Sequence, residues 1–342
     1  MKTIDSRELL SDLDFSRQYF RNQIPVCIKG GMKQSKTCKL WTPDYLKKII
    51  GNKLTRINQS IGGIYGHHQG MVESIIVPFD EAVSLFLSKG HQNGAYYLQQ
   101  SSIKKDFPEL LKDLEYPKWI LNTDLERATN IWFGSGGCVS PLHFDTSQNF
   151  LLQIFGSKLV TLIAPTDSQS LYPDYLSQHR HISNVDPENP DYQKYPLFKG
   201  VKLFKCLLEP GDVLYIPINW WHHVRSLNVS ISVNFWWKRL ELIEGVGLEV
   251  ASVEVLKTII QEFLSQGTDI NMKDFEGETL LLKASNKGYG NIVEALLQLG
   301  ADPYIKSEFL KLGSTAISLA EERGHMDVAR KLQAYMTDKG II

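Results

Sequence analysis

The stretch Pro141-Leu142-His143-Phe144-Asp145 and the later run Trp220-Trp221-His222-His223 decide the fold class of this chain. Between about residues 130 and 237, short runs of β-branched and aromatic residues alternate with glycine and proline turns. Many short strands with this punctuation predict a β-sandwich or barrel. Residues 149–155 and 158–163 flank Gly156-Ser157, a pattern that predicts a β-hairpin.

Before this region the sequence is mixed. Thr42-Pro43 is typical of a helix start, with Thr42 as the N-cap and Pro43 in the first helical position. Residues 79–89 are expected to form another helix. Short strands are expected over residues 24–28 and 96–99.

After Lys238 the pattern becomes helical and repeats itself. Gly267-Thr268-Asp269 recurs as Gly300-Ala301-Asp302, 33 residues later, which is the ankyrin period. We therefore predict three parts. An N-terminal flanking segment covers 1–94, a strand-rich core covers 95–238, and a degenerate leading repeat followed by about two ankyrin repeats covers 239–342.

The composition describes an ordinary globular protein and gives no sign of a nucleic-acid partner. The 342 residues include 37 Lys+Arg and 38 Asp+Glu, so the net charge is −1, which makes a nucleic-acid or membrane partner unexpected. Four scattered cysteines without a CxxC pair are expected to be free thiols in a reducing compartment. The charged start has no apolar signal-peptide core, and no apolar run reaches the ~20 residues of a membrane helix. We expect a cytoplasmic protein, with export by a route without a signal peptide left open.

Three polar residues of the strand-rich region have the spacing of a metal site. His143 and Asp145 are two residues apart, so on a strand both side chains lie on one face. Together with His222 they match the two-histidine, one-carboxylate set of non-haem Fe(II) oxygenases. An isolated His-x-Asp pair is common by chance, and a single core histidine is often only a structural hydrogen-bonding group.

Two further features favour a ligand-binding barrel. Lys158 opens the strand after Gly156-Ser157, where an enzyme that binds 2-oxoglutarate would need a cation. Along the last strand, apolar residues at odd positions from 229 to 237 alternate with Ser230, Ser232, Asn234 and Trp236. An apolar outer face and a polar inner face are what a barrel around a polar ligand requires.

Taken together, these motifs resemble the JmjC, cupin-like family of 2-oxoglutarate oxygenases, and within it the asparaginyl hydroxylase branch typified by factor inhibiting HIF. Further matching motifs are Leu171-Tyr172-Pro173, Asn189-Pro190-Asp191-Tyr192 and Pro210-Gly211-Asp212-Val213. The resemblance implies a double-stranded β-helix of the jelly-roll type with flanking helices. It also implies Fe(II) and 2-oxoglutarate as cofactors, with Fe(II) held by His143, Asp145 and His222.

The resemblance also implies roles for residues around the metal. Lys158 would pair with the distal carboxylate of 2-oxoglutarate, assisted by Tyr97 and Ser140. The metal-binding end of the same molecule would lie near Asn149 and Asn234. The remaining wall would be formed by Trp236. No catalytic residue beyond the metal ligands is implied.

The sequence departs from the asparaginyl hydroxylases at one place. Their Arg-Gln pair, which contacts the target amide, is replaced here by His181-Ile182-Ser183-Asn184 before Val185-Asp186. Hydroxylation of a protein side chain is the expected activity, while asparagine as the target is not supported. A JmjC demethylase, an RNA-modifying hydroxylase and a non-catalytic ankyrin adaptor are the alternatives.

The repeats point to a protein partner. Ankyrin repeats are substrates of the asparaginyl hydroxylase that this chain resembles, and the corresponding hairpin position here is Asn271. We therefore predict Asn271 as a possible modification target, and ankyrin-repeat proteins as possible substrates. Asparagine is also frequent in such turns for structural reasons. The repeats are otherwise expected to bind another protein or to cap the core, and the oligomeric state is left open.

Overall fold

The computed structural model describes residues 2–65, 72–88, 95–120, 124–173, 181–239, 251–265, 269–273, 277–308 and 310–338. The chain divides into two compact units. The first, here called the β unit, contains Met1–Pro117 and Glu126–Trp236. The second, the repeat unit, contains Lys118–Leu125 and Trp237–Ile342.

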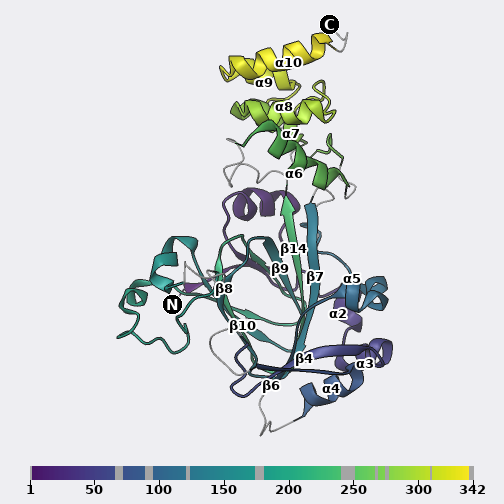
Figure 1. Cartoon of the computed structure of the whole chain (residues 1–342), viewed down its shortest axis with the longest axis vertical. Helices are drawn as coiled ribbons and strands as arrows, with labels where there is room; N and C mark the ends of the chain where they lie inside the picture. Colours follow the sequence, from purple (N-terminus) through teal and green to yellow (C-terminus); the bar gives the residue numbers. More distant parts are fainter. Residues whose placement is uncertain are drawn as a thin grey trace. The chain divides into compact units, whose positions relative to one another are not determined.

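The β unit is built from two sheets (Figure 1). One sheet has the strand order β1-β11-β10-β13-β8, and the other has the order β2-β3-β12-β9-β14-β7-β6-β4-β5. The strands that surround the site are β7 (Asp124–Gly134), β8 (Val139–Phe144), β9 (Gln148–Phe155), β10 (Lys158–Ile163), β11 (Phe204–Leu208), β12 (Val213–Ile216), β13 (Trp221–Ser226) and β14 (Ser230–Arg239). Side chains of both sheets share one buried apolar core, which includes Leu151, Val160 and Leu214. The predicted jelly-roll architecture is confirmed.

The predicted hairpin at Gly156-Ser157 is wrong. Strands β9 and β10 lie in different sheets, and both edges of β10 are occupied by β11 and β13. The turn residues themselves were interpreted correctly: Gly156 has a φ of 67°, and a Cβ there would lie 2.1 Å from the carbonyl oxygen of Val229. A tight turn fixes where two strands meet, but in a double-stranded β-helix it carries the chain from one sheet to the other.

The N-terminal part adds short strands and helices to these sheets. They are β1 (Lys2–Thr3), β2 (Asp5–Arg7), α1 (Asp12–Asp14), a π-helical turn (Phe15–Phe20), β3 (Val26–Ile28), α2 (Lys36–Leu40), α3 (Pro43–Ile50), β4 (Leu54–Ser60), β5 (Val72–Pro78), α4 (Phe79–Leu87), β6 (Ala95–Ser102), α5 (Ile103–Asp106) and a 3₁₀ turn (Pro108–Asp113). The Thr42 hydroxyl accepts the N–H of Tyr45 at 3.2 Å, so the predicted helix start is confirmed. The expected helix at 79–89 and the two short strands are present, although residue 89 lies outside the described residues.

Strand β14 has the two faces that the alternation predicts. Ile231, Val233 and Phe235 are at most 1% exposed on one side. Ser232 and Asn234, on the other side, are equally buried. A polar face that is buried in a sandwich needs hydrogen-bond partners or a ligand, because unpaired polar groups are costly inside a protein.

The repeat unit is helical. It contains α6 (Val253–Ser265), α7 (Leu280–Lys287), α8 (Gly290–Gln298), α9 (Ala316–Glu322) and α10 (Met326–Asp338) (Figure 1). Leu256 and Ile260 of α6 share one apolar core with the later helices. The predicted C-terminal ankyrin architecture is confirmed, while the degenerate leading repeat stays a prediction. No helix among the described residues is both long enough and apolar enough to cross a membrane.

Candidate active site

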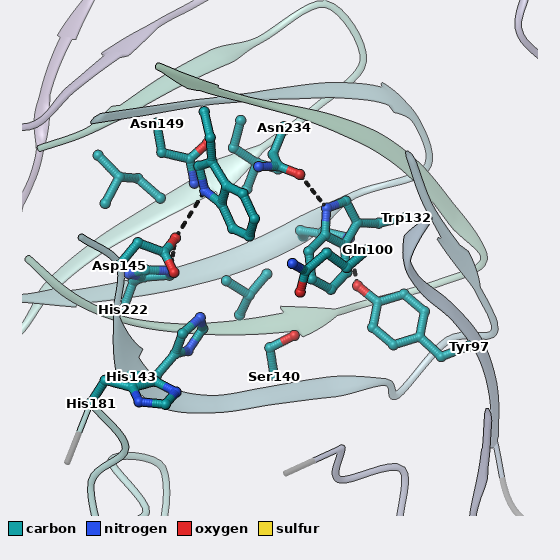
Figure 2. Close-up of a pocket in the computed structure, with 15 residues that line it drawn as sticks. Tyr97, Gln100, Trp132, Ser140, His143, Asp145, Asn149, His181, His222 and Asn234 are labelled. Carbon is teal, nitrogen blue, oxygen red and sulfur yellow. Dashed lines mark hydrogen bonds and ion pairs between the residues drawn. The ribbon is translucent and has the colours of Figure 1, made fainter. Parts of the chain in front are cut away.

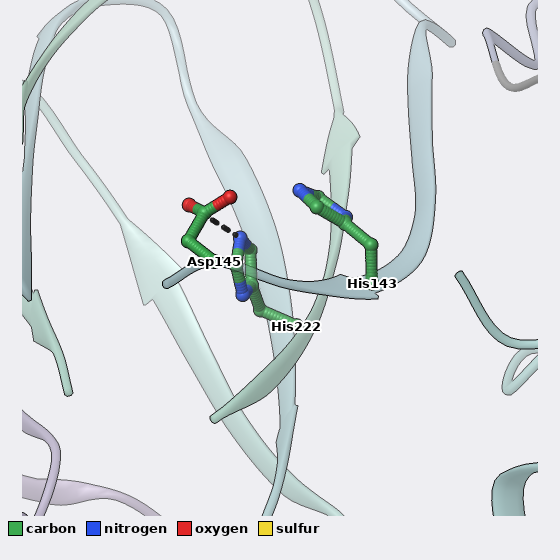
Figure 3. Close-up of side chains that lie close together, drawn as sticks. All are labelled: His143, Asp145 and His222. Atoms are coloured by element: carbon green, nitrogen blue, oxygen red, sulfur yellow. Dashed lines mark ion pairs between the residues drawn. The ribbon is translucent and has the colours of Figure 1, made fainter. Parts of the chain in front are cut away.

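The pairing of β8 with β13 brings the three predicted ligands together (Figure 3). His143 lies directly opposite His222, with their ring centroids 4.2 Å apart. Asp145 follows β8, and its Oδ2 is 3.6 Å from Nε2 of His222. One ligand atom from each of the three residues lies within 4.8 Å of the others. This spacing allows one metal ion to contact all three.

Hydrogen bonds orient these side chains for metal binding. Nδ1 of His143 is 2.7 Å from the carbonyl oxygen of Pro141, and Nδ1 of His222 is 3.0 Å from that of Trp220. A ring that donates through Nδ1 keeps the lone pair of Nε2 free for a metal. The indole N–H of Trp236 donates to Oδ2 of Asp145 at 3.0 Å. Burial and the neighbouring His143 lower the pKa of His222 to about 4, so its ring is neutral, as a ligand must be.

A cavity of about 280 Å³ opens in front of the triad (Figure 2). Its volume is near the lower end for small-molecule sites. The structure places every residue that the sequence assigned to the metal or to 2-oxoglutarate along its walls: Tyr97, Ser140, His143, Asp145, Asn149, Lys158, His222, Asn234 and Trp236. The sequence motifs, spread over about 140 positions, therefore converge on one pocket.

Lys158 is the cation of this cavity, and it is 1% exposed. Its Nζ donates to Ser232 Oγ at 2.7 Å and to Tyr97 Oη at 3.1 Å. No carboxylate of the described residues forms an ion pair with it within 4 Å. Burial lowers the pKa of Lys158 to about 8. A buried ammonium without a counter-ion is costly, so this wall of the cavity favours an anion.

Two amides leave hydrogen-bonding atoms free at the cavity. Asn234 Oδ1 accepts from the indole N–H of Trp132 at 2.7 Å. Nδ2 of Asn234 and Oδ1 of Asn149 are buried without a partner among the described residues. Since buried polar atoms are normally paired, these two are available to a polar ligand.

Two β-bulges change the face of the strand on which certain side chains lie. In a regular strand these side chains would point away from the cavity. Pro141 and Leu142 together face the single residue His223, so Ser140 and His143 reach the same side although they are three residues apart. Strand β6 has a similar irregularity between Leu98 and Ser101, where Gln100 has a φ of 49°. Gln100 consequently lines the cavity together with Tyr97 (Figure 2).

Sequence reasoning missed four polar or aromatic residues of the site, which are Gln100, Trp132, His181 and Ser232, and the aliphatic lining residues Leu151, Ile216 and Val224. Ser232 could have been assigned from its place on the polar face of β14. His181 was noticed only as a departure from the family pattern. It follows the undescribed residues 174–180, and its carbonyl accepts the N–H of Phe144 at 3.0 Å. This bond, with the bridge between Ile182 and His143, places the His181 ring beside the metal triad (Figure 2).

Asn271 belongs to the repeat unit and is not among the residues that line the cavity. Its Oδ1 accepts the N–H of Asp302 at 2.7 Å, and its own N–H donates to Oδ1 of Asp269 at 2.9 Å. The side chain thus joins one repeat hairpin to the next. Its assignment as a modification target stays a prediction.

Comparisons with known proteins identify the family of each region of the chain. A model of the cupin-like domain matches residues 12–241, and a model of ankyrin repeats (three copies) matches residues 248–341. "Lysine-specific demethylase 8" of Xenopus tropicalis is 34% identical over 226 residues, which are 65% of this chain and 50% of that protein. "Jumonji C domain-containing protein 5" of Drosophila melanogaster is 36% identical over 232 residues, 66% of this chain and 57% of the relative.

Another relative bears a different kind of name. The human "tRNA wybutosine-synthesizing protein 5" is 30% identical over 248 residues, which are 68% of this chain and 77% of that protein. The chain spans only about half the length of the demethylase that it matches. The names of these relatives indicate different activities. The predicted likeness to asparaginyl hydroxylases stays untested.

Proposed function

Because this chain belongs to the cupin-like JmjC family and carries C-terminal ankyrin repeats, we propose that it is an Fe(II)- and 2-oxoglutarate-dependent oxygenase that hydroxylates protein side chains. One observation carries the proposal. The buried ammonium of Lys158, which has no carboxylate partner among the described residues, lines the same cavity as three side chains oriented to bind a metal.

The donor set fits the proposed cofactors. His143, Asp145 and His222 would hold Fe(II), a set of two imidazoles and a carboxylate that leaves positions open for 2-oxoglutarate and oxygen. When bound, the iron and 2-oxoglutarate supply the activated oxygen that is inserted into a substrate C–H bond. The chain's own part is to bind and orient. Trp236 fixes the carboxylate of Asp145, and the carbonyl oxygens before each histidine fix the rings.

The opposite end of the cavity would hold the distal carboxylate of 2-oxoglutarate. Lys158 offers the charge, and Tyr97 and Ser140 offer hydroxyl donors. Desolvation raises the pKa of Tyr97 above its ordinary value, so the phenol keeps its proton. The free amide atoms of Asn149 and Asn234 would meet polar atoms at the metal-binding end.

Among the described residues, hydrogen-bonding side chains line the side of the cavity where a substrate would enter. Gln100 is exposed and His181 is partly exposed, and both line the cavity. Hydrogen-bonding groups of this kind suit a side chain or backbone amide of an extended peptide. They do not single out asparagine, so we propose a protein side chain as the substrate class and no particular residue type.

The test is a turnover assay with product analysis. Purified protein with Fe(II), ascorbate and 2-oxoglutarate is expected to form succinate, and mass spectrometry of an ankyrin-protein panel is expected to show an added oxygen atom. His143→Ala is the matched control. If neither succinate nor an oxidised product forms, the chain is a non-catalytic adaptor and the proposal fails.

The tRNA-modifying alternative has one specific observation in its favour, because the alignment to the wybutosine-synthesizing protein covers 77% of that relative. The net charge of −1 does not favour it, since tRNA binding relies on basic surfaces. Parallel assays with tRNA and with methyl-lysine peptides would discriminate the alternatives. An oxidised nucleoside would indicate the first, and released formaldehyde would indicate a demethylase.

The repeat unit supports a protein partner, since ankyrin repeats bind other proteins through extended surfaces. We propose ankyrin-repeat proteins as candidate substrates and Asn271 as a candidate target in a second copy of this chain. The side chain of Asn271 is hydrogen-bonded to Asp302 of the neighbouring hairpin. This contact would have to open locally before Asn271 could be modified. Peptide mass analysis of protein produced with iron tests whether Asn271 is modified. An unmodified Asn271 would contradict its assignment as a target.

A further inference from the structure

The two adjacent histidines of β13 serve opposite faces of their sheet. His222 lines the cavity with the metal triad. His223, one residue on, points to the other face, as the strand period requires. There it is only 3% exposed, and its Nδ1 has no hydrogen-bond partner among the described residues. A buried ring nitrogen without a partner calls for a ligand, an ion or a water molecule.

Two carboxylates face this nitrogen. Oε1 of Glu188 is 3.9 Å from Nδ1 of His223, and Asp186 completes the group. One ligand atom from each of the three residues lies within 4.8 Å of the others, as in the triad. One Asp186 oxygen accepts the N–H of Glu188 at 2.9 Å, so its second oxygen is available. An imidazole with two carboxylates is a donor set that Zn²⁺ and similar divalent ions accept.

A small cavity borders Asp186 and His223, while Glu188 lies outside its lining. It has a volume of about 10 Å³ and is lined by Asp186, His223 and Arg225 together with apolar side chains. A volume of this size holds about one water-sized particle. It therefore has room for a single ion and excludes an organic ligand.

Arg225 is compatible with such an ion. Its Nε donates to both carboxylate oxygens of Glu188, at 2.9 and 2.8 Å, and its Nη2 also donates to Oε2. A carboxylate has about four lone-pair positions, so Glu188 can accept from the guanidinium and still contact a metal. Hydrogen bonds of this kind commonly orient metal-binding carboxylates. The two carboxylates of the cluster outnumber the one guanidinium of Arg225, so the fixed charges of these acidic and basic side chains favour a cation.

We propose that Asp186, Glu188 and His223 form a second divalent-cation site of the zinc type, separate from the catalytic triad. The site joins the segment of residues 181–188 to β13. That segment also pairs with β8 and carries His181 to the active-site cavity. The ion would therefore hold in place a wall of the substrate pocket without taking part in the reaction.

The experiment counts bound metal. Full-length protein is treated with a chelator and dialysed against Zn²⁺, and the zinc bound per chain is measured by elemental mass spectrometry. The wild type is compared with His222→Ala, His223→Ala and Asp186→Asn. We expect about two ions per chain in the wild type and about one in each variant. The adjacent histidine variants control for each other. Asp186→Asn keeps the shape of a partly exposed side chain, so it tests the site even if His223→Ala fails to fold.

The outcomes separate this inference from the proposed function. A wild type that binds one ion, lost only in His222→Ala, would overturn the second site and leave the catalytic assignment standing. One ion lost only in His223→Ala and Asp186→Asn would support the second site and contradict the triad. Two ions that persist in Asp186→Asn would show that the second ion lies elsewhere, and the inference would fail.

Discussion

Buried polar side chains have different uses in the β unit and the repeat unit. In the repeat unit, Glu278 is 1% exposed, and its Oε1 accepts from the Ser307 hydroxyl and from the N–H groups of Glu308 and Leu310 at 2.6–3.1 Å. In the β unit, Lys158 is equally buried, and its Nζ donates to the hydroxyls of Tyr97 and Ser232 without a carboxylate partner among the described residues. The first arrangement completes a loop, and the second lacks an anion.

This difference separates structural from functional polarity. A carboxylate that accepts several backbone N–H groups is doing what a loop requires. A buried cation with hydroxyl neighbours, beside amide atoms that have no partner, has unused binding capacity. We therefore assign the chemistry to the β unit and a structural role to the buried carboxylate of the repeats, and each prediction below tests one side of the comparison.

The largest effect is expected at the metal triad. Replacing His143 or Asp145 with Ala removes one of three ligands and should abolish both iron binding and 2-oxoglutarate turnover. Metal analysis and succinate formation measure the two losses. Asp302→Asn, which changes a carboxylate in the repeat unit, should leave both unchanged. Full activity in Asp145→Ala would contradict the assignment of the metal triad.

The next effect concerns the anion site. Lys158→Ala removes a charge-assisted hydrogen bond to the distal carboxylate, an interaction of about 1.5–3 kcal/mol. The KM for 2-oxoglutarate should rise by about 10- to 100-fold, while iron content stays the same. Lys199→Ala is a suitable control, because that lysine lies outside the cavity lining. An unchanged KM would contradict the role of Lys158.

The buried ammonium should also give the ligand-free protein a particular pH dependence. Burial lowers the pKa of Lys158 from 10.5 to about 8, so between these values the unfolded chain holds a proton that the native state has released. Stability therefore rises with pH across this window, by about 3 kcal/mol relative to Lys158→Met. Urea unfolding followed by tryptophan fluorescence reports mainly on the β unit, because five of the seven tryptophans lie there: Trp41, Trp132, Trp220, Trp221 and Trp236. Saturating 2-oxoglutarate should flatten the slope, and equal slopes in both proteins would show that Lys158 is not buried as a cation.

On the other side of the comparison, Glu278→Ala should destabilise the repeat unit without affecting turnover. The change leaves the Ser307 hydroxyl and two backbone N–H groups without their acceptor, at a cost of about 2–4 kcal/mol. Thermal unfolding followed by far-UV circular dichroism measures it. Glu322→Gln removes an exposed ion pair with Lys311 and should cost less than about 1 kcal/mol. If folded Glu278→Ala protein no longer formed succinate, the assignment of the chemistry to the β unit alone would be contradicted.

The smallest effect is expected at Asn271. Asn271→Ala removes the acceptor for the N–H of Asp302, which water can replace in part because Asp302 is exposed and Asn271 is only partly buried, so about 1 kcal/mol should be lost. The same thermal measurement detects it. A loss of stability as large as that of Glu278→Ala would contradict the view that Asn271 contributes only the hydrogen bond to Asp302.

Much of the architecture was predictable because the relevant signals are local. Strand periodicity alone places His143 and Asp145 on one face, and the alternation along β14 identifies its polar side. The 33-residue offset identifies the repeats. These patterns depend on the strand or helix that contains them and on no distant partner.

What could not be predicted depends on strand pairing. The bulge in β6 changes the side of the strand on which Gln100 lies. Nothing in the sequence around Gln99-Gln100 predicts this bulge. The turn at Gly156-Ser157 was recognised, yet which strands pair is decided by sheet closure across the whole unit. Likewise, the approach of Asp186 to His223 joins segments that are far apart in sequence.

The central claim is that the β-unit cavity binds Fe(II) and 2-oxoglutarate together, and anaerobic absorption spectroscopy tests it most directly. Adding 2-oxoglutarate to Fe(II)-loaded protein without oxygen should produce a visible metal-to-ligand charge-transfer band. The band should be absent in His143→Ala and should require about 10- to 100-fold more 2-oxoglutarate in Lys158→Ala. No band in folded, iron-loaded wild-type protein at saturating 2-oxoglutarate would contradict the account.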